Sequence, residues 1–116
     1  DPSVPRGWRI ARADTEIGGQ AIKAGALVMP IIAAANRDPA RFEDADSLDI
    51  RRENNKHMAF GNGIHFCLGA PLARLEAQIA FDHLLRRLPQ LHRNGDPTRG
   101  NTYILRGFNS LPVRWS

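Results

Sequence analysis

Hydrophobic and polar positions follow short β-type patterns over the first third of the chain. Residues 9–17 have the composition of a strand, and Gly18-Gly19 separates them from a return strand over residues 20–22. Paired glycines between two such stretches are typical of a tight hairpin turn. The apolar run over residues 27–32 has the length of a buried strand. Residues 1–32 are therefore predicted to be rich in β-structure.

The central part of the chain changes from an irregular pattern to a helical one. Residues 33–37 predict a short helix that Asp38-Pro39 ends, and the charged remainder of residues 33–59 has no sustained period. Residues 70–88 predict a helix of about 19 residues, roughly 28 Å long. Apolar residues line two sides of this helix, which predicts that much of its circumference is buried. We expect an irregular meander followed by one long helix.

The last part of the chain, residues 89–116, predicts short strands, with residues 102–105 and 113–115 as the pair that best fits a sheet. Strands in small hairpins, a meander and one long helix indicate an α+β fold class. The chain has 116 residues, which suits one domain and leaves no room for two. We therefore expect a single domain over residues 1–116.

Composition and charge exclude several classes of protein. The chain carries one Cys, 16 Lys and Arg, 12 Asp and Glu, and 42% hydrophobic residues. One cysteine excludes a disulfide framework and a four-cysteine zinc site, and it fits a reducing compartment. No apolar run approaches the roughly 20 residues that cross a bilayer, and no signal-peptide pattern opens the chain. The basic residues are scattered and form no stripe, so we expect no nucleic-acid partner. The single cysteine and the apolar runs together predict a cytoplasmic protein that does not bind membranes.

The residues around Cys67 form the strongest candidate site. Cys67 lies just before the predicted long helix, where the helix dipole and free backbone N–H groups favour a thiolate. A thiolate is the form of cysteine that binds metal or attacks an electrophile. Nearby glycines allow the backbone to turn sharply or to approach something large and flat. Phe60 and Phe66 are expected to shield the sulfur from water, and His65 could bond an acidic group beside it.

Three other interpretations of Cys67 follow from the residues alone. A lone cysteine in an intracellular domain is often a small buried hydrophobe. A zinc site would need paired ligand spacing, which His57, His65 and Cys67 lack. A cysteine nucleophile remains open, although the sequence places no second His or Asn to complete a triad.

The ten residues 60–69 match the pattern F-G-x-G-x-H-x-C-x-G, which resembles the haem-binding signature of the cytochrome P450 family. The similarity continues through residues 70–76, which resemble the start of that family's long proximal helix in soluble bacterial members. Residues 35–39, followed by Phe42, are similar to the segment before the family's meander. The resemblance implies the C-terminal part of the cytochrome P450 fold, incomplete as a fold. Its segments would be a β-rich segment (1–32), a short helix and meander (33–59), the haem-ligand loop (60–69), the long helix (70–88) and short strands (89–116).

The resemblance also implies roles for individual residues and a cofactor, haem b. Cys67 would be the axial thiolate ligand of the haem iron, a ligand type that promotes O–O bond cleavage. His65 and Arg9 resemble residues that bind the haem propionates through charge-assisted contacts, although Arg9 could instead be an ordinary solvated arginine. The other residues implied to contact haem are Phe60, Gly61 and Gly69.

Weaker similarities concern the substrate and the electron donor. Four residues resemble segments that wall the family's substrate pocket, although ordinary packing is the preferred explanation for them: Val4, Pro5, Leu105 and Phe108. Arg74 and Lys56 lie near the presumed proximal face, where an acidic electron carrier could dock, and a solvated basic face is the alternative.

The implied function is that of a haem-thiolate monooxygenase, which oxidises a small hydrophobic organic substrate with O2 and electrons from a ferredoxin or flavoprotein. The family's Glu-x-x-Arg pair and its distal acid–alcohol pair have no match in this sequence. We therefore expect no catalytic residue in this chain and no activity from the chain alone. The alternatives are a non-catalytic haem-binding or interaction module derived from a truncated relative, and a fragment that binds nothing stably.

Overall fold

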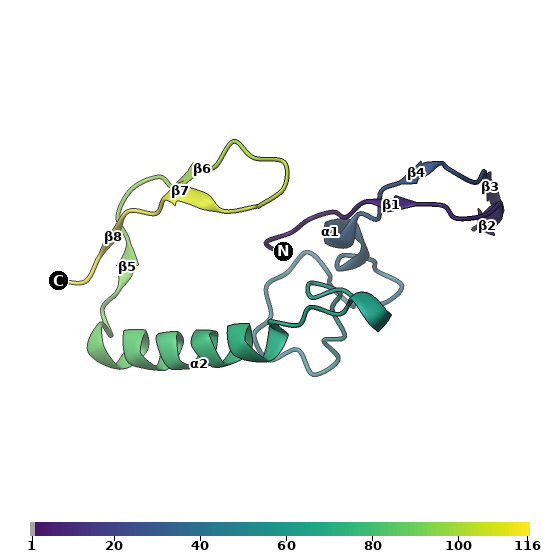
Figure 1. Cartoon of the computed structure of the whole chain (residues 1–116). Helices are drawn as coiled ribbons and strands as arrows, with labels where there is room; N and C mark the ends of the chain where they lie inside the picture. Colours follow the sequence, from purple (N-terminus) through teal and green to yellow (C-terminus); the bar gives the residue numbers. More distant parts are fainter. Residues whose placement is uncertain (1) are drawn as a thin grey trace. The chain divides into compact units, whose positions relative to one another are not determined.

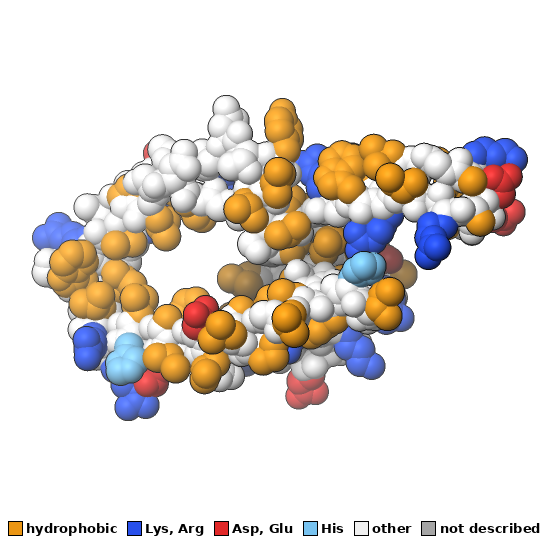
Figure 2. Space-filling model, in the orientation of Figure 1, with side chains coloured by type: hydrophobic (Ala, Val, Ile, Leu, Met, Phe, Trp, Pro, Cys, Tyr) orange, Lys and Arg blue, Asp and Glu red, His pale blue; other side chains and the backbone are white. Residues whose placement is uncertain are grey.

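A computed structural model of the chain describes residues 2–116 (Figure 1). The chain divides into two compact units, Asp1–Ala59 and Phe60–Ser116. Each unit consists of small two-stranded sheets, helical segments and long irregular segments. The helix of the first unit is short, whereas the second unit has a 3-10 turn and a long helix. The α+β fold class expected from the sequence is confirmed. Hydrophobic side chains are common on the surface (Figure 2), and the buried residues among residues 2–116 are Pro2, Phe42 and Ala70.

The first unit begins with two small antiparallel sheets. β2 (Thr15–Ile17) and β3 (Gln20–Ile22) form a hairpin in which Thr15 lies opposite Ile22. Gly18 and Gly19, with φ of 57° and 79°, form its turn. Two consecutive residues with positive φ match the right-handed twist of the strands, and glycine adopts this backbone at low cost. The hairpin predicted from the glycine pair is confirmed.

The strand expected over residues 9–17 is wrong as a continuous element. β1 (Arg9–Ile10) pairs with β4 (Leu27–Val28), whereas β2 pairs with β3. Asp14 lies in the break, where its carboxylate accepts the Ala24 N–H at 2.9 Å and pairs with the Lys23 ammonium at 2.7 Å. These contacts to residues ten and nine positions later hold the chain in the break between the two strands.

The expectation of one strand over the apolar run of residues 27–32 is also wrong. The strand ends at Val28, and α1 (Ile32–Ala35) starts within the run, one residue before the predicted short helix. Pro30 lies between them and has no N–H to donate to a sheet, while its carbonyl accepts the Gly7 N–H at 3.0 Å. The proline therefore separates a strand from a helix.

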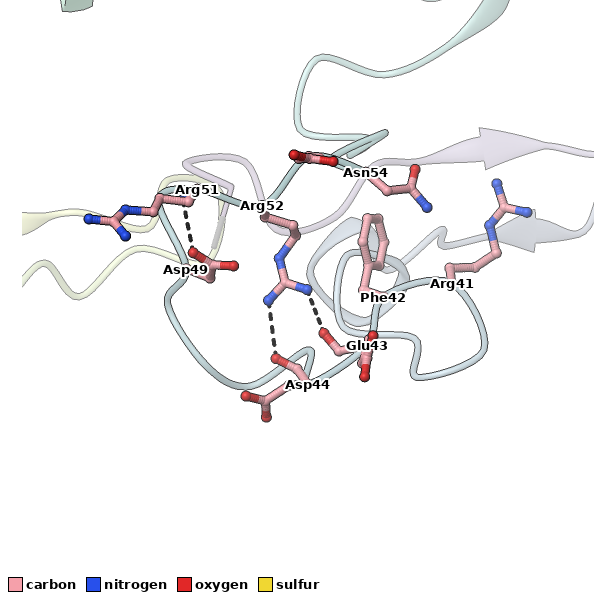
Figure 3. A pocket seen from close by; sticks show the side chains of 9 residues that line it. Arg41, Phe42, Glu43, Asp44, Asp49, Arg51, Arg52 and Asn54 are labelled. Atoms are coloured by element: carbon pink, nitrogen blue, oxygen red, sulfur yellow. Dashed lines mark hydrogen bonds between the residues drawn. The ribbon is translucent and has the colours of Figure 1, made fainter.

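The meander, residues 36–59, is organised around Arg52. The Arg52 guanidinium donates to the backbone carbonyls of Glu43 and Asp44 (Figure 3), and it also donates to the Ser47 carbonyl. At the ends of the meander, the Asn36 side-chain carbonyl accepts the Met58 N–H at 2.7 Å. An open cavity of about 510 Å³ lies beside Arg52 and is lined mainly by charged residues. Side chain–backbone hydrogen bonds therefore replace regular secondary structure here.

The second unit contains a 3-10 turn, η1 (Gly63–His65), and the long helix α2 (Ala70–Arg87). Two small antiparallel sheets follow the helix along the chain. β5 (His92–Arg93) pairs with β8 (Val113–Arg114), and β6 (Thr98–Arg99) pairs with β7 (Phe108–Ser110). The predicted helix is confirmed to within one residue at its C-terminus.

The predicted pairing of residues 102–105 with residues 113–115 is wrong. The Thr102 hydroxyl accepts the N–H groups of Ile104 and Leu105, at 3.2 and 3.1 Å, and closes a turn at this point. A threonine that bonds to the backbone two and three residues ahead competes with a sheet ladder. The strand at Val113 is real, but its partner is β5.

The expectation that α2 is buried over much of its circumference is also wrong for this chain. Among the helix residues, only Ala70 is buried, and the larger apolar side chains are exposed (Figure 2). These exposed residues are Leu72, Leu75, Ile79, Phe81, Leu84 and Leu85. Within Phe60–Ser116, α2 packs against no strand. No helix among residues 2–116 combines the length and the apolar character that a membrane crossing requires.

Candidate functional site

The cysteine loop, residues 60–69, is shaped by glycines and by its own backbone. Gly61 and Gly63 have φ of 74° and 65°, in the left-handed region that disfavours other residues. A Cβ at Gly61 would also lie 3.3 Å from the His65 carbonyl oxygen. The Cys67 N–H donates to the Phe60 carbonyl at 2.8 Å, which closes the loop around η1. The two glycines thus allow a closed loop whose ends are Phe60 and Cys67.

The loop joins α2 through two backbone hydrogen bonds. The Ala70 N–H donates to the Cys67 carbonyl at 3.2 Å, and the Ala73 N–H donates to the Gly69 carbonyl at 2.9 Å. Gly69 is the N-cap of α2, and a Cβ at this position would lie 3.9 Å from the Cys67 sulfur. Cys67 is a free, exposed cysteine two residues before the cap. Its sulfur is therefore available to a ligand at the start of a helix, where the dipole favours negative charge.

An aromatic pair lies beside the loop closure. The rings of Phe60 and Phe66 meet edge to face, with centroids 6.5 Å apart and planes at 64°. The guanidinium carbon of Arg74 lies 5.2 Å from the Phe60 ring centroid. The expectation that these rings shield the sulfur is wrong for this chain, because Cys67 is exposed and Phe66 itself is 47% exposed. The rings pack on each other and leave the sulfur open.

His65 closes η1, and its side chain is exposed. Within the described chain its imidazole pairs with no acidic side chain. Residues 2–116 also contain no group of three or more His, Cys, Asp and Glu side chains that could hold a metal ion.

The structure brings five predicted site residues together in the cysteine loop and leaves five outside it. Phe60, Gly61, His65, Cys67 and Gly69 are the loop residues. Arg9, Val4 and Pro5 belong to the first unit, and Leu105 and Phe108 belong to the β6–β7 region of the second.

The five outlying residues have these surroundings. Arg9 lies on β1, where its guanidinium donates to the carbonyl of its neighbour Trp8 at 2.8 Å. Val4 and Leu105 are exposed, and Pro5 is half-buried. The Phe108 ring lies under the Arg99 guanidinium, 4.7 Å from its carbon. The roles predicted for these residues stay predictions.

Two arginines with structural roles were not identified from the sequence as such. Arg52 binds three carbonyls in the meander, and backbone acceptors leave no trace in the sequence. Arg74 was assigned to a basic face, but it contacts an aromatic ring 14 positions earlier in the sequence. The only signal in the sequence for this contact is the position of Arg74, one turn into the helix that follows the glycine-containing loop.

Comparison with known proteins relates nearly the whole chain to one family. The family model described as Cytochrome P450 matches residues 1–102. Cytochrome P450-SU2 of Streptomyces griseolus is 49% identical over 111 residues, which cover 92% of this chain and 27% of that protein. Cytochrome P450 monooxygenase PikC of Streptomyces venezuelae is 45% identical over 111 residues, which cover 93% of this chain and 27% of PikC.

Among solved structures, P450BioI in complex with an acyl carrier protein ligated to hexadec-9Z-enoic acid matches with a TM-score of 0.97 and 40% identity. This match covers all of the present chain and 30% of P450BioI. The chain therefore spans about a quarter to a third of the length of the proteins that it resembles.

Proposed function

The chain belongs to the cytochrome P450 family, and we propose that it is the haem-thiolate portion of a monooxygenase in which Cys67 is the axial iron ligand. The single observation that carries this proposal is the free, exposed cysteine in a glycine-shaped loop before α2. Its sequence matches F-G-x-G-x-H-x-C-x-G over residues 60–69. The fold of the chain is a partial cytochrome P450 fold.

The residues of the cysteine loop fit haem b, the cofactor that the family implies. A thiolate is a haem-iron ligand, and the exposed Cys67 can provide one. Gly61 and Gly69 carry no side chain beside the loop, and a Cβ at position 69 would approach the sulfur to 3.9 Å. The half-buried Phe60 ring offers an apolar surface beside the closure. A flat macrocycle could therefore approach the sulfur without meeting a side chain from these two glycines.

We assign the remaining cofactor contacts to His65 and Arg9. His65 has an exposed imidazole that can donate to a carboxylate, and Arg9 has an exposed guanidinium suited to the same partner. Phe60 would pack beside the porphyrin. Val4, Pro5, Leu105 and Phe108 are assigned more weakly, as contacts of a small hydrophobic organic substrate.

The chain's own residues bind and orient the cofactor. Cys67 would hold the iron through its sulfur at the start of α2, where the helix dipole favours a negatively charged ligand. The Cys67 N–H donates to the Phe60 carbonyl and so fixes the backbone of the loop beside the sulfur. Haem, when bound, supplies the redox chemistry that uses O2 and two electrons to transfer one oxygen atom to an organic substrate. The electrons would come from a ferredoxin or flavoprotein.

We assign no catalytic residue to this chain and propose that it is inactive by itself. Its exposed α2 side chains and exposed sulfur offer little exclusion of water, which such chemistry requires. The test is substrate oxidation by the purified chain with haemin, O2 and an electron donor. Measurable turnover by the chain alone would contradict this part of the proposal.

A ferrous carbon-monoxide difference spectrum tests the ligand assignment. The purified chain is mixed with haemin, reduced and exposed to carbon monoxide, beside Cys67→Ala and a surface control, His83→Ala. We expect a strongly red-shifted Soret band in the wild type and in His83→Ala, and none in Cys67→Ala. The same red-shifted band in Cys67→Ala would overturn the assignment.

Haem titrations of further variants test the propionate contacts. His65→Ala and Arg9→Ala should each weaken haem binding about tenfold, the effect of losing a charge-assisted hydrogen bond. His83→Ala and Arg87→Ala are the matched controls. Unchanged haem affinity in His65→Ala or Arg9→Ala would remove that residue from the assignment.

The alternative function is a non-catalytic haem-binding or interaction module. The exposed apolar side chains of α2 favour it, because exposed apolar patches of this kind mark interaction surfaces. The two functions differ when a polypeptide that supplies the distal acid–alcohol pair is added together with a reductant and substrate. The monooxygenase portion would then take part in turnover, whereas the module would bind haem and turn over nothing in any assembly. We also propose a cytoplasmic location, because a free cysteine without a disulfide suits a reducing compartment.

A further inference from the structure

Arg74 connects α2 to the closed end of the cysteine loop. Its guanidinium carbon lies 5.2 Å from the centroid of the Phe60 ring, within the range of a cation–π interaction. Arg74 lies on α2, and Phe60 is the first residue of the loop. Because the two residues belong to different segments of the second unit, this contact joins the helix to the start of the loop.

Phe60 is also the residue that closes the loop around Cys67. Its carbonyl accepts the Cys67 N–H at 2.8 Å, and its ring packs edge to face with Phe66, the residue next to Cys67. A movement of Phe60 therefore changes both the hydrogen bond of Cys67 and the packing of its neighbour. Arg74 contacts the ring of this same Phe60 from its position on α2.

The charge of Arg74 has no carboxylate partner within the described chain. Arg86, on the same helix, pairs with Asp82 at 2.7 Å, whereas residues 2–116 place no ion-pair partner on Arg74. Its guanidinium is free to rest on the ring, and the half-buried Phe60 presents an apolar face to it. The contact thus depends on a cation and a ring rather than on an ion pair.

We infer that Arg74 is a positioning residue for Cys67: its guanidinium holds the Phe60 ring, and Phe60 in turn holds the loop closed on the Cys67 N–H. This role rests on the proposed function, because it matters to iron binding only where Cys67 is the ligand. It differs from a basic residue that serves only as a solvated or docking charge, because such a residue needs no fixed place over a ring.

Amide hydrogen exchange of Cys67 in the haem-free chain tests the inference. We expect Arg74→Ala and Arg74→Met to speed the exchange about two- to fivefold, the effect of losing one exposed cation–π contact. Arg74→Lys should exchange nearly as slowly as the wild type, because it keeps a cation. Arg87→Ala, an exposed arginine on the same helix, is the matched control and should change nothing.

The comparison of methionine with lysine separates charge from packing. Methionine keeps a long apolar stem without the charge, so slow exchange in Arg74→Met would overturn the inference. A double-mutant cycle gives the second criterion: on a Phe60→Leu background, Arg74→Ala should have no further effect on Cys67 exchange. An equal effect on both backgrounds would also overturn it.

A measurement on the wild type keeps the inference testable if an Arg74 variant fails to fold. The Arg74 δ-methylene protons should resonate upfield of those of Arg87 because they lie near the face of the Phe60 ring. Phe60→Leu should abolish the difference. Equal shifts for Arg74 and Arg87 in the wild type would overturn the inference.

The carbon-monoxide spectrum separates this inference from the proposed function. If Cys67→Ala keeps the red-shifted band, the ligand assignment fails, whatever Arg74 does to exchange in the haem-free chain. If the wild type shows the band, a smaller fraction of the carbon-monoxide complex should show it in Arg74→Met. Arg74→Lys should return that fraction to the wild-type level. A normal band with unchanged Cys67 exchange in Arg74→Met overturns only the role of Arg74.

Discussion

The meander and the cysteine loop are both irregular, but different forces give each its shape. In the meander, the Arg52 guanidinium donates hydrogen bonds to the carbonyls of three residues, so one long side chain holds the backbone in place. In the cysteine loop, the backbone bonds to itself, and positive-φ glycines make this possible. The meander thus uses a side chain to hold its structure, whereas the cysteine loop leaves the Cys67 and His65 side chains exposed.

The largest effect should come from removing the side chain that holds the meander. Arg52→Ala leaves the carbonyls of Glu43, Asp44 and Ser47 without this donor, and we expect a loss of about 2–3 kcal/mol in the free energy of unfolding. Urea denaturation measures it. The control is Arg51→Ala, whose backbone N–H still donates to Asp49. Equal losses in the two variants would show that Arg52 does not organise the meander.

A smaller effect is expected from a methyl group in the cysteine loop. Gly61→Ala places a Cβ on a residue with φ of 74°, 3.3 Å from the His65 carbonyl oxygen, and should cost about 1–2 kcal/mol. Gly107→Ala is the control, because nothing lies within 4 Å of a Cβ there. Thermal unfolding of both variants gives the comparison. A Gly61→Ala chain as stable as Gly107→Ala would contradict a loop shaped by backbone conformation.

The bond between the ends of the meander should contribute less than Arg52. Asn36→Ala removes the acceptor of the Met58 N–H and should cost about 1 kcal/mol, with faster amide exchange at Met58. Asn54→Ala, a nearby amide in the same meander, should leave Met58 exchange unchanged. If the two variants exchange alike at Met58, the Asn36 bond does not hold the ends together.

The smallest effect concerns the exposed pair in the break between β1 and β2. The Lys23 ammonium, and then the Ala24 N–H, lower the pKa of Asp14 below its ordinary value of 3.8, against a small opposing effect of burial. A lowered folded pKa stabilises the fold above pH 3.8, and this contribution disappears as the pH falls through the folded pKa. Carboxyl NMR shifts should show the Asp14 pKa rising in Lys23→Gln and unchanged in Lys56→Gln. No rise in Lys23→Gln would contradict the pairing.

Sequence reasoning succeeded where local chemistry decides the structure. Gly18-Gly19 predicted a hairpin because two residues with positive φ suit that turn, and the helix predicted over residues 70–88 is observed over Ala70–Arg87. The F-G-x-G-x-H-x-C-x-G pattern located the cysteine loop because its glycines and cysteine carry their conformation and chemistry in their identity. Five candidate site residues were therefore found together in one loop.

The failures came from contacts that residue identity does not record. The apolar run at residues 102–105 favoured a strand, but one Thr102 hydroxyl closed a turn. Arg52 was missed because its acceptors are backbone carbonyls, which every residue has. The apolar faces of α2 predicted burial, yet burial depends on what packs against a helix, and within Phe60–Ser116 no strand does.

The apolar side of α2 determines how the chain responds to salt. Its leucine, isoleucine and phenylalanine side chains face water, including Phe81 at 64% and Leu85 at 65% exposure. Sulfate is excluded from protein surfaces and so strengthens apolar contacts. Ammonium sulfate should therefore precipitate this chain at a lower concentration than it precipitates a variant with Phe81→Ser and Leu85→Gln. Chloride buffers of low ionic strength should therefore keep this chain in solution better than sulfate buffers during purification.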